Sequence, residues 1–188
     1  LREKGPRPRK YISIQEWYKC KHHIPYYIAI FDEEISDFYS WIIPKENYLI
    51  FGSALSPKDN TLEKYNKLKS KITEFGFNLD NKVKTEGAYI NRPKKSSQFF
   101  IGKDKVALVG EASGAISPSS AEGISYALKS SLYLTQSLEE GLDGFLDRYS
   151  KRVYSIKGNL LLKNLKSPAM YNPFFRKLAM KSGLQSIK

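Results

Sequence analysis

The chain has few of the residues that build metal centres and disulfide frameworks: among its 188 residues are one cysteine and two histidines. The single cysteine, Cys20, excludes an internal disulfide and is compatible with a reducing compartment, so we expect a cytoplasmic protein. His22 and His23 are adjacent, and Cys20 is the one further potential metal ligand close to them in sequence. A metal site needs more ligands at suitable spacing, so we predict none.

Long hydrophobic runs are also absent. No apolar run approaches the roughly 20 residues that a membrane-spanning helix needs, and the first ten residues, LREKGPRPRK, lack the apolar core of a signal peptide. The chain begins with Leu1 rather than Met, so we expect it to be part of something longer. A composition that is 41% hydrophobic and 13% aromatic is nevertheless sufficient to build a folded core.

Negative charge is scarce toward the C-terminus. The net charge is +12, and residues 145–188 hold ten Lys or Arg residues against one acid, Asp147, so that nine of the twelve net charges lie in this basic tail. A basic tail can meet nucleic acid, an anionic membrane surface or an acidic partner, or it can be a solvated helix face. No RNA-binding signature or helix-turn-helix pattern is visible, so we predict no nucleic-acid partner.

The first half of the chain reads as strands. Aromatic and β-branched runs separated by turn residues predict strands over 11–18, 25–31, 37–44 and 47–55, and their short spacing favours an antiparallel meander. A helix is predicted from Leu62 to Phe75, ended by Gly76, and a further strand near 82–90.

The second half reads as a strand, a glycine-rich loop and helices. Strands are predicted over 97–101 and 105–109, with Val106–Val109 fully buried, followed by helices over 124–138 and 142–160 and an irregular link between Pro168 and Pro173. The expected inner face of the first of these helices consists of Ile124, Ala127, Leu128, Ser131, Leu134 and Leu138. The order predicts an α+β fold, with a sheet domain over 1–98 and a second domain over 99–188.

The segment VGEASGAISPSSAEGISYALKSS, residues 109–131, contains few large side chains between a strand and a helix. A strand, a glycine-rich turn and a helix N-terminus together present backbone N–H groups to an anion or a polar cofactor. Residues 110–114 and 118–123 are two such places. The alternative is a pair of tight turns that need glycine for steric reasons alone.

This segment resembles the second FAD-binding motif of the p-hydroxybenzoate hydroxylase superfamily, in which a strand ends in Gly-Asp-Ala-Ala-Gly and a later Pro precedes a Gly-Glu-Gly-Ile helix start. The resemblance implies that Glu111 holds the ribityl chain of FAD and that amides at the helix start lie beside the flavin ring. Glu111 replaces the family's Asp, and Ala121 replaces a Gly. The implied FAD-binding residues are Gly110, Glu111, Ala112, Gly114, Pro118, Glu122, Gly123 and Ile124.

A second segment, FYSWIIPKENYLIFGSA, resembles the Tyr-x-Trp-x-Phe-Pro … Gly-x-Gly pattern of geranylgeranyl reductase-like flavoproteins, with seven residues between Pro44 and Gly52. Tyr39 and Trp41 are two apart on a strand and therefore face one side of the sheet. The resemblance implies that Tyr39, Trp41, Pro44 and Gly52 line a cavity for a polyprenyl chain. The alternative is that Tyr39 and Trp41 are ordinary core aromatics.

Together the two motifs imply the C-terminal half of an FAD-dependent oxidoreductase that reduces carbon–carbon double bonds of an isoprenoid-like lipid. Its α+β architecture would be an antiparallel-rich substrate-binding sheet, the C-terminal part of an FAD-binding α/β domain, and closing helices. Reduced nicotinamide or ferredoxin would be the electron donor, and the basic tail would contact a membrane surface from the cytoplasm. No catalytic residue is predicted.

The resemblance is incomplete in one respect, because the Gly-x-Gly-x-x-Gly turn that holds the FAD pyrophosphate is missing from this chain. We therefore expect the rest of the site in another segment. Two other functions stay open: a halogenase or monooxygenase of the same superfamily, whose Trp-x-Trp-x-Ile-Pro signature is close to residues 39–44, and a non-catalytic basic module that binds an anionic surface.

Overall fold

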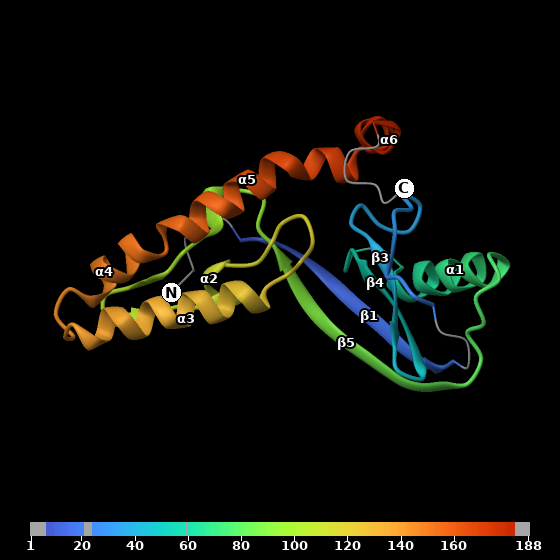
Figure 1. The fold of residues 1–188 in the computed structure, drawn as a ribbon, viewed down its shortest axis with the longest axis horizontal. Coiled ribbons are helices and arrows are strands. Elements are labelled where there is room, and N and C mark those ends of the chain that lie inside the picture. Colours follow the sequence, from blue (N-terminus) through green and yellow to red (C-terminus); the bar gives the residue numbers. More distant parts are fainter. Residues whose placement is uncertain (1–6, 21–23, 59, 183–188) are drawn as a thin grey trace. The chain divides into compact units, whose positions relative to one another are not determined.

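The computed structural model describes residues 7–20, 24–58 and 60–182 (Figure 1). The chain divides into two compact units, which we call the sheet unit, Lys10–Ile90, and the helical unit, Asn91–Lys188 together with Leu1–Arg9. The chain passes from the sheet unit to the helical unit between Ile90 and Asn91, whereas the sequence predicts the domain boundary after residue 98. His22 and His23 lie outside the described residues.

The sheet unit contains a five-stranded sheet in the order β2-β3-β4-β1-β5, which confirms the predicted antiparallel-rich sheet. The strands β2, β3 and β4 follow one another as expected, but β1 pairs with β4 rather than with β2, so the simple meander is wrong. The reason is length, because β1 pairs with β4 over eight residues, from Ile12–Leu55 to Lys19–Tyr48, whereas β2 has three residues. The bounds are β1 Arg9–Lys19, β2 Ile28–Ile30, β3 Ser40–Lys45, β4 Tyr48–Leu55 and β5 Lys82–Arg92.

One helix, α1 (Thr61–Glu74), packs against one face of this sheet and confirms the predicted helix. It ends before Gly76, whose φ of 93° is readily available to glycine. The buried side of α1 contributes Tyr65, Leu68 and Ile72. The core between α1 and the sheet is completed by Tyr18, Ile35, Ile42, Leu49, Phe51 and Leu55.

The same side of the sheet buries one carboxylate. Glu16 is 6% exposed and accepts from Lys69 Nζ at 2.8 Å, from Lys82 Nζ at 3.0 Å and from the Tyr18 hydroxyl. Burial opposes ionisation of Glu16, but these three hydrogen bonds outweigh it and lower the pKa from 4.5 to about 2. The carboxylate is therefore charged in the folded chain at neutral pH.

The helical unit begins with a short 3₁₀ turn, η1 (Ser96–Gln98), and a two-stranded hairpin of β6 (Gly102–Lys103) and β7 (Val106–Ala107). The predicted strand over 97–101 is therefore wrong. So is the fully buried strand Val106–Val109, because β7 has two residues and Val106 is exposed. Its described strand partner is β6 alone, and Ala107 and Val109 are only partly buried against the helical core.

Five helices follow, at α2 Gly110–Ser113, α3 Ile124–Glu139, α4 Phe145–Arg152, α5 Tyr154–Tyr171 and α6 Pro173–Lys181. The predicted helix over 142–160 is two helices that meet at Val153. The irregular link predicted from Pro168 to Pro173 is also wrong, because α5 continues through Pro168 to Tyr171. Proline removes one helical N–H donor, and here that loss does not end the helix.

The start of α3 at Ile124 agrees with the sequence, but its predicted inner face is confirmed only at Ala127 and Leu134, which contact Gly110 and the core. Ile124, Leu128 and Leu138 are exposed, and the buried side consists of Tyr126, Ser130 and Ser137. Serine can be buried here because its small side chain lets a neighbouring backbone segment come close, and its hydroxyl forms hydrogen bonds with that backbone. The Ser130 hydroxyl accepts from the Gly110 amide at 2.9 Å and donates to the Tyr126 carbonyl at 2.7 Å.

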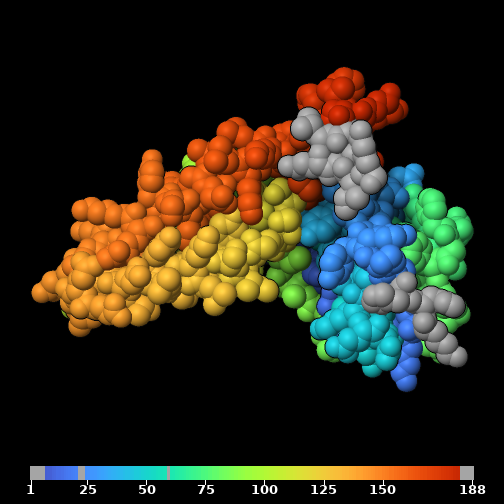
Figure 2. Space-filling view, viewed as in Figure 1, coloured from blue at the N-terminus to red at the C-terminus, as the bar shows by residue number. Residues whose placement is uncertain are grey.

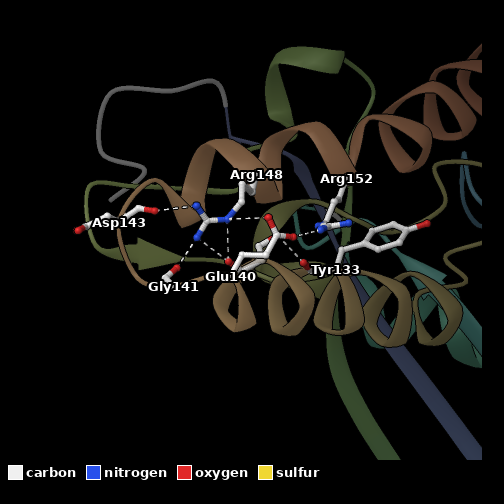
Figure 3. A network of polar contacts seen from close by, with 7 residues as sticks. Tyr133, Glu140, Gly141, Asp143, Arg148 and Arg152 are labelled. Atoms are coloured by element: carbon white, nitrogen blue, oxygen red, sulfur yellow. Dashed lines mark hydrogen bonds and ion pairs between the residues drawn. The ribbon is translucent and has the colours of Figure 1, made fainter.

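The junction of α3 and α4 is fixed by Arg148 (Figure 3). Its guanidinium donates to the Ser137 carbonyl at 2.9 and 3.1 Å, to the Asp143 carbonyl at 2.7 Å and to the Gly141 carbonyl. Carbonyls at a helix C-terminus lack partners within the helix, and a cation there also complements the helix dipole. Glu140 forms an ion pair with Arg152 beside this network.

Among the described residues, no helix is both long enough and apolar enough to cross a membrane.

Candidate functional site

The glycine-rich turn after β7 folds as the one-turn helix α2. Gly110 and Gly114 have φ values of 55° and 85°, in the left-handed region that glycine adopts without strain. The Ser113 hydroxyl donates to the Gly110 carbonyl at 2.7 Å, and the Gly114 amide donates to the Glu111 carbonyl at 2.9 Å. The turn is therefore held by its own backbone and by one buried serine.

Gly110 also lies close to α3. A Cβ atom at this position would lie 3.1 Å from Ala127 Cβ and 3.4 Å from Ala127 Cα. The absence of a side chain at Gly110 thus has a packing reason within this unit, besides any role toward a ligand. Such contacts place α2 directly against the first turns of α3.

One of the two carboxylate oxygens of Glu111 accepts hydrogen bonds in the described structure. Its Oε1 accepts from the Asn91 amide at 2.9 Å and from Asn91 Nδ2 at 2.8 Å. No hydrogen bond among the described residues uses its Oε2, so that oxygen is the one available to a ligand. Glu111 therefore anchors the end of β5 and keeps one acceptor for a hydroxyl group.

The loop from Ser117 to Gly123 leads into α3. The Ser117 amide donates to the Glu122 carbonyl at 2.8 Å, and the Ala121 amide donates to the Ser117 carbonyl at 3.0 Å. Ala121 has a φ of 53°, a conformation that costs an L-residue free energy and is favourable for glycine. The backbone at Ala121 thus has the form typical of a glycine position.

The N-terminus of α3 presents backbone donors. Glu122 Oε1 accepts from the Ser125 amide at 2.9 Å and from the Ser125 hydroxyl at 2.8 Å. In the part of the chain that the structure describes, no hydrogen bond uses the amides of Gly123 and Ile124. Two donors at the positive end of a 16-residue helix are a suitable place for negative charge.

A buried arginine that the sequence did not single out holds this loop. Arg92 is 3% exposed and donates through Nε to the Pro118 carbonyl at 2.8 Å and through Nη2 to Ser167 Oγ at 3.3 Å. Its guanidinium carbon lies 4.3 Å from the ring centroid of Tyr171, whose hydroxyl donates to the Ser119 carbonyl. No local signal could have found Arg92, because its partners are 26, 75 and 79 positions away in sequence.

The residues that the sequence predicts to bind substrate lie in the sheet unit, and most of them are on the face opposite α1. Trp41 pairs with Gly52 across β3 and β4, and a Cβ at Gly52 would lie 2.4 Å from Trp41 Cε2, so the indole lies directly over the glycine. The rings of Tyr39 and Trp41 are 5.7 Å apart, and burial raises the pKa of Tyr39. Pro44 pairs with Leu49 of the core and faces the α1 side instead. Tyr39, Trp41 and Gly52 are thus brought together, and Pro44 is not.

Solved structures show which class of protein has this fold. The chain matches a geranylgeranyl bacteriochlorophyll reductase-like protein from Thermoplasma acidophilum with a TM-score of 0.66 and 16% identity, over 94% of this chain and 55% of that one. It also matches CmlS, a flavin-dependent halogenase, with a TM-score of 0.55 and 12% identity, over 97% of this chain and 39% of that one. The chain therefore has the α+β fold of part of the FAD-dependent oxidoreductases.

Sequence comparison identifies a particular relative. Protein CbrA of Escherichia coli O9:H4 is 40% identical over 179 residues, which is 95% of this chain and 49% of CbrA. CbrA of Shigella sonnei is likewise 40% identical over 179 residues. The chain spans about half the length of the curated relatives it matches. No family model matches it.

Proposed function

We propose that this chain forms part of the FAD site of an FAD-dependent oxidoreductase. The observation that carries the proposal is the N-terminus of α3, where the amides of Gly123 and Ile124 are unused and Ala121 has the backbone conformation of a glycine. These residues fit a flavin because one edge of its ring system accepts hydrogen bonds and gains negative charge when the flavin is reduced. Two free amides at a helix N-terminus are suitable donors to that edge. The motif resemblance supports the same reading.

Three side chains have a role in this proposal. Glu111 offers Oε2 to a hydroxyl of the ribityl chain while Oε1 stays on Asn91. Glu122 orients the start of α3 through Ser125, and Arg92 keeps the Pro118 carbonyl turned away from the ligand. Bound FAD, reduced by the electron donor, would supply a hydride to one carbon of a carbon–carbon double bond, and the other carbon would take up a proton.

We propose an isoprenoid-like lipid as the substrate, bound over Tyr39, Trp41 and Gly52. Aromatic rings above a glycine form an apolar surface that suits a long hydrocarbon chain. Reduced nicotinamide or ferredoxin is proposed as the electron donor, on the resemblance alone.

We further propose that the basic tail contacts an anionic membrane surface through α6. Asn172 caps this helix by accepting from the amides of Phe174 and Phe175 at 3.0 and 3.2 Å. Large apolar side chains and basic ones share the exposed surface of α6, a composition typical of interfacial helices. The residues concerned are Phe174, Phe175, Leu178 and Met180 with Lys177 and Lys181.

The test uses a chimera in which this chain replaces the segment of CbrA that it matches. The purified chimera is expected to carry flavin, measured by its visible absorbance after release. Glu111→Ala should reduce flavin occupancy, because it removes both the free acceptor and the anchor of Asn91. Glu139→Ala, an exposed carboxylate at the far end of α3, is the matched control and should change nothing.

A third variant separates the two roles of Glu111. Asn91→Ala removes the Nδ2 donor, keeps the backbone amide of residue 91 and leaves both carboxylate oxygens, so its flavin occupancy should fall less than that of Glu111→Ala. A folded chimera without flavin would contradict the proposal and favour a non-catalytic basic module. Unchanged occupancy in Glu111→Ala would remove Glu111 from the site.

A further inference from the structure

The outward side of α3 carries an unusual row of apolar side chains, which we call the α3 stripe. Ile124, Leu128 and Leu132 follow one another at intervals of four residues and are 77%, 69% and 54% exposed. Residues four apart lie on the same face of a helix. Figure 2 shows the yellow surface of α3 along the length of the helix.

The opposite side of α3 makes this arrangement distinctive. Ser130 and Ser137 are fully buried there, and Tyr126 is buried with its hydroxyl donating to Asn159 Oδ1 at 2.5 Å. A surface helix normally turns its apolar side to the core and its polar side to water. In α3 the most buried side chains are Tyr126 and two serines, and three of the aliphatic ones, Ile124, Leu128 and Leu132, are exposed, whereas Leu134 packs against the core.

Charge indicates what kind of surface the stripe fits. Ser131 and Thr135 lie on the same side of the helix, and Lys129, at the border of the stripe, is the one charged side chain between Ile124 and Leu132. A surface that meets an anionic lipid or nucleic acid presents a cluster of basic residues, and one lysine beside an aliphatic row is not such a cluster. An uncharged aliphatic row fits the apolar surface of a folded polypeptide.

The relatives indicate which polypeptide this is. The chain matches 49% of CbrA, so about half of CbrA has no counterpart in this 188-residue chain. We propose that the α3 stripe packs against the polypeptide that corresponds to this other part of CbrA. The packing does not depend on flavin, because it rests on the stripe and on the length of the relatives.

The test measures whether the stripe is covered when that polypeptide is present. Cysteine is introduced as Leu128→Cys or, as a control, as Leu62→Cys in α1, both in a Cys20→Ser background. Leu62 is 66% exposed, which closely matches Leu128. The rate of maleimide labelling is then compared between the 188-residue chain and the CbrA chimera.

In the chimera, labelling at position 128 should slow by about tenfold or more relative to the isolated chain, because a buried thiol reacts only on local opening. Labelling at position 62 should be unchanged. Equal rates at position 128 would overturn the proposal. Protection at position 128 that rises with the concentration of the isolated chain would also overturn it, in favour of pairing between two copies.

A second measurement covers a chimera that folds poorly. In intact CbrA, aspartate at the position aligned with Leu128 should lower the unfolding midpoint, and aspartate at the position aligned with Leu62 should not. Equal midpoints for the two variants would contradict a buried stripe. Flavin content enters neither readout, so a flavin-free protein with a protected position 128 would defeat the proposed function and leave this inference standing.

Discussion

Gly110→Ala is expected to destabilise the helical unit strongly, for two separate reasons. The first is the backbone, since φ at this position is 55°. The second is the contact with α3, since the new methyl group would lie 3.1 Å from Ala127 Cβ and 3.4 Å from Ala127 Cα. The Cα belongs to a helix backbone, which cannot move aside as a flexible side chain would.

The magnitude follows from these two effects. A left-handed conformation costs an L-residue about 1–2 kcal/mol, and an extra methyl in a packed contact costs about 1–3 kcal/mol. Alanine also restricts the unfolded chain, which offsets about 0.4–1 kcal/mol. We therefore expect Gly110→Ala to lower the free energy of unfolding of the helical unit by about 2–4 kcal/mol.

The assay is urea unfolding followed by two probes. Both tryptophans, Trp17 and Trp41, lie in the sheet unit, so tryptophan fluorescence reports that unit. Far-UV circular dichroism is dominated by the helices of the other unit. Gly110→Ala should shift the dichroism transition to lower urea at constant slope and shift the fluorescence transition less.

Two controls make this reasoning refutable. Gly158 lies within α5, and a Cβ there would meet nothing within 4 Å, so Gly158→Ala should stabilise by about 0.5–1 kcal/mol. Adding Ala127→Gly to Gly110→Ala removes the close contact, and the double-mutant cycle should give a coupling of about 1–3 kcal/mol. Zero coupling, or a Gly110→Ala variant as stable as the parent, would show that the approach of α2 to α3 is not as described.

Three further results are expected. The pKa of Glu16 is lowered from 4.5 to about 2 in the folded chain, so ionised Glu16 stabilises the fold fully above pH 4.5, and this stabilisation is lost as the pH falls toward 2. Glu16→Gln should remove this acid dependence, at most about 3 kcal/mol, from the free energy of unfolding measured by urea at different pH values. Ala121→Gly should stabilise by about 0.5–1 kcal/mol in the same assay by relieving its left-handed backbone, and a loss of stability would contradict the φ of 53°. Arg148→Ala should lower the urea midpoint seen by dichroism, because it removes the hydrogen bonds to the carbonyls between α3 and α4, a loss of about 2–3 kcal/mol in the free energy of unfolding. Arg148→Lys should recover only part of this free energy.

Local sequence patterns predicted much of the fold. The aromatic and β-branched runs gave the positions of β1, β3 and β4, and the spacing of Tyr65, Leu68 and Ile72 gave α1. These elements were predictable because each is specified by neighbours within a few residues and by a nearby turn. The place of β1 beside β4 was not, because register is decided by pairing between residues 29 to 43 positions apart.

For the candidate site, the comparison with the sequence concerns its local backbone. The left-handed glycines and the start of α3 follow from the motif, and Ala121 takes the conformation that a glycine would have there. The inner face of α3 was predicted wrongly, because the periodicity rule assumes that each apolar row is covered within the chain. Arg92 and Tyr171 were missed because distant segments bring them together.

The contacts of Arg92 make the length of α5 a part of the site. Ser167 and Tyr171 both lie in the last turns of this helix, which begins at Tyr154. Inserting or deleting one residue between 154 and 167 would turn both side chains by about 100° and shift them by about 1.5 Å. Such a change would withdraw Tyr171 from Arg92 and free the loop before α3. Natural variants of this protein should therefore keep the spacing within α5 constant between residues 154 and 171.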